Sequence, residues 1–128
     1  MDILNDLNPQ QKEAVEYIDG PALVLAGAGS GKTRVLTYRL AYLVSLGVPP
    51  HRILAMTFTN KAAGEMKHRA EELLGRQMDV WVSTFHSFCA RMLRRYGEAL
   101  GLNPGFTIYD EKDSLDVIKR VLKDMGIS

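Results

Sequence analysis

The sequence has a single cysteine and no long apolar run, and each scarcity excludes a class of protein. Cys89 has no second cysteine in the chain, so an intramolecular disulfide is excluded and a reducing cytoplasm is favoured. No stretch approaches the roughly 18 uncharged apolar residues of a membrane span, and the first residues lack the pattern of a secretory signal. We therefore expect a cytoplasmic protein without a membrane partner.

Net charge is also scarce, since 16 basic side chains balance 15 acidic ones to leave +1. A general basic field is therefore excluded, and any binding of nucleic acid must depend on local contacts. The 128 residues suffice for one domain with a single core. Glycine and proline divide the chain into alternating strand-like and helical segments, which predicts an α/β fold with a parallel sheet.

The most informative stretch is the glycine-rich segment Ala26-Gly27-Ala28-Gly29-Ser30-Gly31-Lys32-Thr33. Before it, the apolar residues 22–26 predict a central strand that is buried on both faces. After it, the spacing of apolar side chains over residues 34–47 predicts a helix. A strand, a glycine loop and a helix in this order direct backbone N–H groups and the helix dipole at one place, which suits a phosphate.

This is the Walker A pattern, in which Lys32 adds a cation for the β and γ phosphates and the Thr33 hydroxyl can ligate Mg²⁺. Ala26 occupies the position of the pattern's first glycine. The close approach of the backbone to a phosphate is then left to the three remaining glycines, Gly27, Gly29 and Gly31.

Helices are predicted at four further places from capping residues and apolar spacing. They are residues 9–18 with Asn8 as N-cap, a helix capped by Asn60 that ends at Gly75, a helix from about His86 to Leu100, and a final helix capped by Asp110.

Two apolar runs, residues 53–57 and 79–83, predict a second and a third strand, and residues 106–109 predict a short fourth one. Open α/β sheets bind their ligands at the carboxyl ends of the strands. Phe58 follows the second strand, and an aromatic ring exposed there is a platform for a nucleic-acid base.

Two partial motifs are set aside. Asn60-Lys61-Ala62-Ala63 has alanine where the guanine-reading motif of GTPases has its aspartate, which excludes a GTPase. Asp110-Glu111 follows an apolar run, as a Walker B acidic pair does, but that run is short and contains Thr107. Because the two acids open an amphipathic helix, capping is favoured over Mg²⁺ coordination.

Taken together, four separated segments resemble, in order and spacing, the amino-terminal part of the UvrD/Rep/PcrA-type superfamily 1 DNA helicases. The segments are Leu7-Asn8-Pro9-Gln10-Gln11, residues 26–33, residues 57–66 and Thr84-Phe85-His86-Ser87-Phe88. The resemblance implies a RecA-like P-loop NTPase fold, a three-layer α/β/α arrangement with a mostly parallel sheet, here truncated. It further implies that residues 1–105 are the N-terminal part of the first RecA-like ATP-binding motor domain and that residues 106–128 begin an inserted helical subdomain.

The resemblance also implies roles for individual residues. Gln11 is similar to the glutamine that hydrogen-bonds the adenine edge, and Arg34 to the arginine that lies against adenine, while Lys32 and Thr33 keep their catalytic phosphate and Mg²⁺ roles. The whole set implied to bind ATP is Gln11, Ala26, Gly27, Ala28, Gly29, Ser30, Gly31, Lys32, Thr33 and Arg34. The set implied to line a track for single-stranded DNA is Phe58, Thr59, Asn60, Thr84, Phe85 and His86.

The function that the resemblance implies is an ATP-dependent 3′-to-5′ DNA helicase acting on single-stranded DNA and its junctions with duplex. The family's Walker B motif and second RecA-like domain are expected after Ser128, so the chain alone is expected to hydrolyse ATP weakly or not at all. Two alternatives stay open: a nucleotide- or single-strand-binding module without catalysis, and the start of a helicase–nuclease. A sheet that lacks its later strands is expected to expose an edge that promotes self-association.

Overall fold

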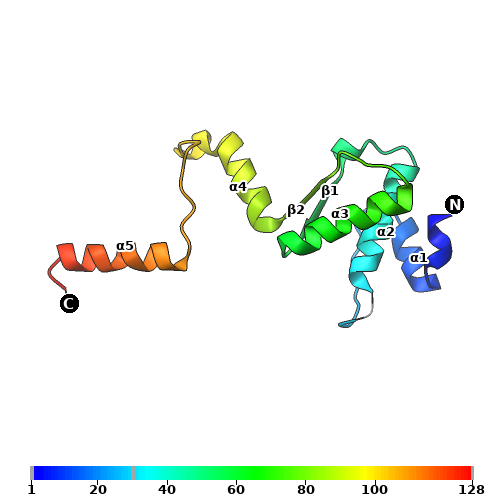
Figure 1. Ribbon diagram of the computed structural model, residues 1–128, viewed down its shortest axis with the longest axis horizontal. Helices are drawn as coiled ribbons and strands as arrows, with labels where there is room; N and C mark the ends of the chain where they lie inside the picture. The colour runs from blue at the N-terminus through cyan, green and yellow to red at the C-terminus, as the bar shows by residue number, and fades with distance from the viewer. Residues whose placement is uncertain (1, 30, 128) are drawn as a thin grey trace. The chain divides into compact units, whose positions relative to one another are not determined.

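The computed structural model describes residues 2–29 and 31–127, which form a mixed α/β chain (Figure 1). The chain divides into two compact units, one up to Phe88 and one from Cys89 onward. In chain order the elements are η1 (Ile3–Asp6), α1 (Pro9–Glu16), α2 (Lys32–Ser45), η2 (Pro50–Arg52), β1 (Leu54–Thr57), α3 (Asn60–Leu74), β2 (Trp81–Thr84), α4 (Phe85–Tyr96), η3 (Gly97–Leu100) and α5 (Glu111–Asp124). The division falls inside α4, and the boundary at 105/106 between motor domain and inserted subdomain stays a prediction.

The sheet of the first unit consists of β1 and β2, which pair in parallel with Thr57 opposite Thr84. The parallel α/β class predicted from the sequence is therefore confirmed, whereas within the described residues the sheet has two strands and not the layers of a complete RecA-like domain. Parallel strands need a crossover, which α3 supplies by packing on both β1 and β2.

The core of the first unit lies on both sides of α2. One cluster joins α2 to α3 and to the segment before β2, and its buried members are Leu40, Ala41, Val44, Met66, Ala70, Met78 and Val80. A second cluster, made of Val15, Val35 and Tyr38, joins α2 to α1. Arg39 adds a polar link, because its guanidinium donates to the carbonyls of Ala14 and Tyr17 at the end of α1.

The predicted central strand over residues 22–26 is wrong. This segment has no regular secondary structure, and the side chains of Leu23 and Leu25 are 84% and 87% exposed. A strand requires a neighbour with which to pair, and among the described residues β1 and β2 pair with each other and not with this segment. The apolar pattern of residues 22–26 is typical of a buried strand, but a pattern cannot supply the partner.

Two other local expectations are corrected in the same unit. Asn60 is the first residue of α3 and not its cap, because the extended backbone of Thr59 lets the Thr59 hydroxyl accept from the Ala62 N–H at 3.1 Å. The helix ends at Gly75, as predicted, with that glycine in the left-handed conformation. The first helix begins after Asn8 as predicted but ends at Glu16, earlier than residue 18.

In the second unit, residues 106–109 form no strand. Arg94 instead fixes the segment: its guanidinium carbon lies 4.6 Å from the Phe106 ring centroid, and Nη1 donates to the Pro104 carbonyl at 3.1 Å. The predicted helix from about residue 86 becomes α4 followed by the tighter turn η3. The final helix is confirmed, since Asp110 and Asp113 each accept a hydrogen bond from the other's backbone N–H.

None of the helices among residues 2–29 and 31–127 combines the length and the apolar character that a membrane span needs.

Candidate functional site

Helix α2 begins differently from the other α-helices of the described chain. Side-chain oxygens of Asn8, Thr59, Thr84 and Asp110 accept hydrogen bonds from first-turn N–H groups of α1, α3, α4 and α5. The residue before α2 is Gly31, in the left-handed conformation with φ of 88°, and no described side chain caps the helix there. Its first-turn N–H groups, at the positive end of the helix dipole, are therefore left for an external acceptor, and an anion suits them best.

The first three positions of α2 are Lys32, Thr33 and Arg34, and all three side chains are exposed. Within the described chain no carboxylate forms an ion pair with Lys32, so its ammonium is available to a phosphate. The Thr33 hydroxyl is a hard oxygen ligand of the kind that Mg²⁺ prefers. An uncapped helix start, a lysine and a threonine in adjacent positions thus fit a magnesium-bound polyphosphate.

The loop before α2 bends at Ala28 and Gly29, and residues 26–29 are exposed. Of the three glycines expected to give close approach, Gly29 and Gly31 have positive φ and Gly27 does not. Glycine adopts the left-handed conformation without strain, so the backbone alone favours glycine at positions 29 and 31. Ser30, also predicted to contact nucleotide, lies outside the described residues.

Gln11 lies directly against this loop. Its side-chain oxygen accepts from the Asn8 N–H at 3.1 Å, in a capping box at the start of α1. A methyl group placed on Gly31 would come within 2.7 Å of the Gln11 Nε2, so the amide occupies the space beside that glycine. The structure thus brings the predicted adenine-reading residue to the loop with its NH₂ group on the loop side.

Arg34 is held by residues that sequence reasoning missed. Its Nη2 donates to the Asp6 carbonyl at 2.8 Å, and its guanidinium carbon lies 4.9 Å from the Tyr38 ring centroid. Beside it, a cleft of about 370 Å³ between α2 and α3 is lined by Thr33, Arg34, Tyr38 and Arg69, among others. Asp6 and Arg69 lie far from the glycine loop in the sequence, so no local signal marks either of them.

The predicted nucleic-acid residues gather at the carboxyl ends of the two strands. Because Thr57 and Thr84 are in register, the residues that follow them emerge side by side. The Phe58 and Phe85 rings lie 5.6 Å apart between centroids, at an interplanar angle of 33°. Their side chains are 89% and 45% exposed, and an exposed pair of rings is a surface on which bases can stack.

The polar residues that follow or end the two strands differ in exposure and in role. Thr84 is buried, and its hydroxyl accepts from the Ser87 N–H at 3.0 Å; the Thr59 hydroxyl has the equivalent role in α3. Both threonines shape the loops, but Thr59 is exposed, as are Asn60 and His86. The accessible surface therefore includes two aromatic rings, a hydroxyl, an amide and an imidazole.

We expect Gly31→Ala to lower the free energy of unfolding. The left-handed backbone alone costs an alanine about 1–2 kcal/mol, and the contact with Gln11 adds to that cost because the new methyl group meets the amide. Urea unfolding followed by circular dichroism measures the loss. In a Gln11→Ala background the same substitution should cost only the backbone contribution, whereas an equal cost in both backgrounds would show that the two residues are not in contact.

The chain is similar to known proteins over nearly its whole length. Residues 7–128 match the UvrD/REP helicase N-terminal domain. The chain is 56% identical over 127 residues to the ATP-dependent DNA helicase PcrA of Bacillus subtilis strain 168, and 54% identical to the proteins of that name from Staphylococcus aureus strain Mu50 and Staphylococcus epidermidis. Each alignment covers 98% of this chain and 17% of the relative's length. Because the match extends over nearly all of its residues, the chain belongs to the UvrD/REP helicase N-terminal domain family.

Proposed function

We propose that this chain is the part of an ATP-dependent DNA helicase that binds ATP and single-stranded DNA. The observation that carries the proposal is the start of α2, which no described side chain caps and where exposed Lys32 and Thr33 follow Gly31, the glycine against which Gln11 lies. In the intact protein this part would serve 3′-to-5′ translocation on single-stranded DNA and the unwinding of duplex at its junctions. The relatives named above, of which the chain spans 17%, are described as ATP-dependent DNA helicases.

In the proposed ATP site, different groups of the chain bind the phosphates, the Mg²⁺ and the base. The N–H groups of the α2 first turn and the Lys32 ammonium bind the phosphates, and the Thr33 hydroxyl ligates Mg²⁺. When bound, Mg²⁺ neutralises charge on the β and γ phosphate oxygens. Gln11 reads the edge of the base from the α1 side of the loop, and Arg34 lies against the base. The residues proposed to bind the phosphates are thus those whose charge and first-turn N–H groups have no side-chain partner in the part of the chain that the structure describes.

The proposed DNA surface depends on stacking more than on charge. With a net charge of +1, the chain has little general attraction for a polyanion, so the affinity must come from contacts to bases. Phe58 and Phe85 supply two adjacent rings, and Asn60 and His86 add polar contacts at their margin. Bases stack on aromatic side chains with little sequence preference, which suits an enzyme that must move along any strand.

Lys32→Ala should weaken the binding of ATP·Mg²⁺ by about 10- to 100-fold, because a hydrogen bond to a charged group is worth about 1.5–3 kcal/mol. Isothermal titration calorimetry of the chain measures the change. Lys119→Ala removes an exposed lysine of α5 and serves as the control, with an expected affinity equal to that of the wild type. If Lys32→Ala binds ATP as tightly as the unaltered chain does, the proposed site is wrong.

Phe58→Ala should weaken the binding of an oligo(dT) strand, since base stacking on one aromatic side chain is worth about 1–3 kcal/mol. Fluorescence anisotropy with a labelled strand provides the dissociation constant. Phe58→Trp is the matched variant, because it keeps a ring at the same exposed position and should retain most of the affinity. Equal losses in both variants would mean that the ring does not act by stacking.

We also propose that the apolar segment 22–26 promotes self-association of the chain. Its side chains are exposed and its backbone lacks a sheet partner among the described residues, so two copies can pair these segments. Sedimentation velocity should show a larger species that grows with protein concentration, and Leu25→Lys should abolish it. Ile118→Lys alters an apolar residue of the other unit and should leave the association intact; a chain that stays monomeric at every concentration contradicts the proposal.

A further inference from the structure

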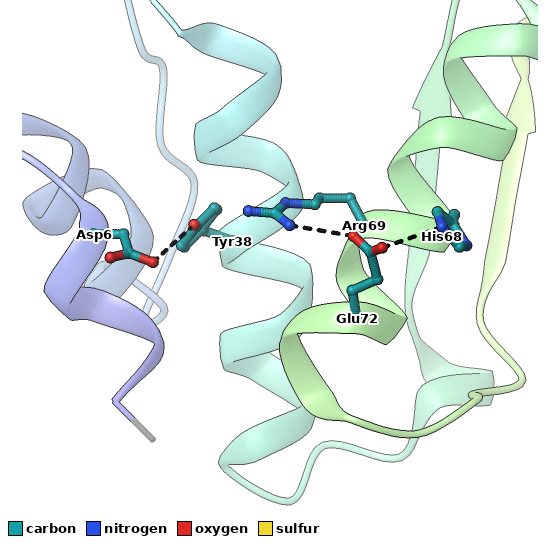
Figure 2. A network of polar contacts seen from close by, with 5 residues as sticks. All are labelled: Asp6, Tyr38, His68, Arg69 and Glu72. Carbon is teal, nitrogen blue, oxygen red and sulfur yellow. Dashed lines mark hydrogen bonds and ion pairs between the residues drawn. The ribbon is translucent and has the colours of Figure 1, made fainter.

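Tyr38 is at the centre of a polar network that lies outside every motif noted in the sequence (Figure 2). Its ring is 1% exposed, in the cluster that joins α1 to α2. Its hydroxyl donates to the Asp6 Oδ2 at 3.5 Å, and the Arg34 guanidinium lies over its face. One buried side chain therefore meets both the residue proposed to lie against the base and the segment η1 that precedes Gln11.

Asp6, Arg34 and Tyr38 close a triangle of contacts. The Asp6 carbonyl accepts from Arg34 at 2.8 Å, the Asp6 carboxylate accepts from Tyr38, and Arg34 and Tyr38 stack at 4.9 Å. An arginine side chain that ends in solvent can adopt many rotamers, and ordering it costs entropy when a ligand binds. Here the triangle holds the guanidinium in one place before any ligand arrives.

Helix α3 supports the triangle from its other side. Figure 2 shows the Arg69 guanidinium between Tyr38 and Glu72, and its Nη1 lies 3.2 Å from the Glu72 Oε2. Hydrogen bonds with Glu72 and with Tyr38 raise the pKa of Arg69 above its ordinary value. Glu72 is held in turn by His68, with 3.3 Å between the His68 Nε2 and Glu72 Oε1.

We propose that Tyr38 and Arg69 are positioning residues for nucleotide binding, which fix Arg34 where it meets the base. Tyr38 acts through its ring and its hydroxyl, and Arg69, which lines the same cleft with its guanidinium on the Tyr38 side (Figure 2), acts through that hydroxyl. Neither residue touches the phosphates, so the network governs the contribution of the base and ribose to affinity and leaves that of the triphosphate unchanged. This inference rests on the proposed ATP site.

Comparison of two ligands separates positioning from a general structural role. Calorimetry measures the dissociation constants of ATP and of inorganic tripolyphosphate, both with Mg²⁺, for each variant of the chain. Tyr38→Leu removes the ring beneath Arg34 and should weaken ATP binding by about tenfold, in line with a cation–π contact of 1–2 kcal/mol. Its affinity for tripolyphosphate should equal that of the wild type.

Two milder variants keep the test decisive if Tyr38→Leu fails to fold. Tyr38→Phe keeps the ring and loses the hydroxyl, and Arg69→Met removes an exposed guanidinium at little risk to the core. Each should weaken ATP binding by about threefold, and the double variant by no more than Tyr38→Phe alone, because that variant already removes the hydroxyl through which Arg69 acts. His68→Ala is the control: it takes a partner from Glu72 but leaves the Arg69–Tyr38 contact, so ATP binding should not change.

The outcomes separate the two proposals. A wild-type chain that binds neither ATP nor tripolyphosphate overturns the ATP site, and the inference with it. If the wild type binds both but the ratio of the two dissociation constants is the same in Tyr38→Phe, Arg69→Met and His68→Ala, the ATP site stands and the positioning role is wrong. Equal losses for ATP and tripolyphosphate in Tyr38→Phe and Arg69→Met would likewise assign both residues a purely structural part.

Discussion

The contact between Gln11 and Gly31 is the constraint on which the candidate site depends. Two separate features favour glycine at position 31: its backbone is left-handed, and the Gln11 amide fills the place that a side chain would occupy. The same glycine is the residue before α2, and no side chain among residues 2–29 and 31–127 caps the first-turn N–H groups there. The close approach of Gln11 to Gly31 therefore joins α1 to the loop, and the helix start that follows Gly31 is open to an anion.

Helix α2 connects the glycine loop to the rest of the first unit by packing against both α1 and α3. Its buried face is shared between two clusters, so α1 and α3 both take their position from it. Arg34 and Arg39 tie its exposed side to η1 and to the end of α1 through backbone carbonyls. A guanidinium that donates to backbone carbonyls can fix a segment without a matching acid.

Features that depend on a few neighbouring residues could be predicted from the sequence, whereas features that need a distant partner could not. Caps and helix ends such as Asn8, Gly75 and Asp110 were predicted correctly, because the chemistry of a cap lies within a few residues. The strand over residues 22–26 was wrong because a strand exists only with a partner, and the predicted cap of α3, Asn60, was wrong by one residue because Thr59 is the cap. The glycine loop was visible as a motif, whereas the contacts of Arg34 with Asp6 and Tyr38 could not be read from spacing.

The starts of the three helices α2, α3 and α4 also explain why one small unit can present two different surfaces. At α3 and α4 the hydroxyls of Thr59 and Thr84 each accept from one first-turn N–H group, so a capping oxygen already occupies these helix starts. What they expose instead is a pair of rings, Phe58 and Phe85, brought together by the register of the strands. At α2 none of the described side chains closes the helix, and a lysine and a threonine follow at once. Self-capping thus separates a surface suited to bases from one suited to phosphates, and the chain needs no large excess of positive charge to distinguish them.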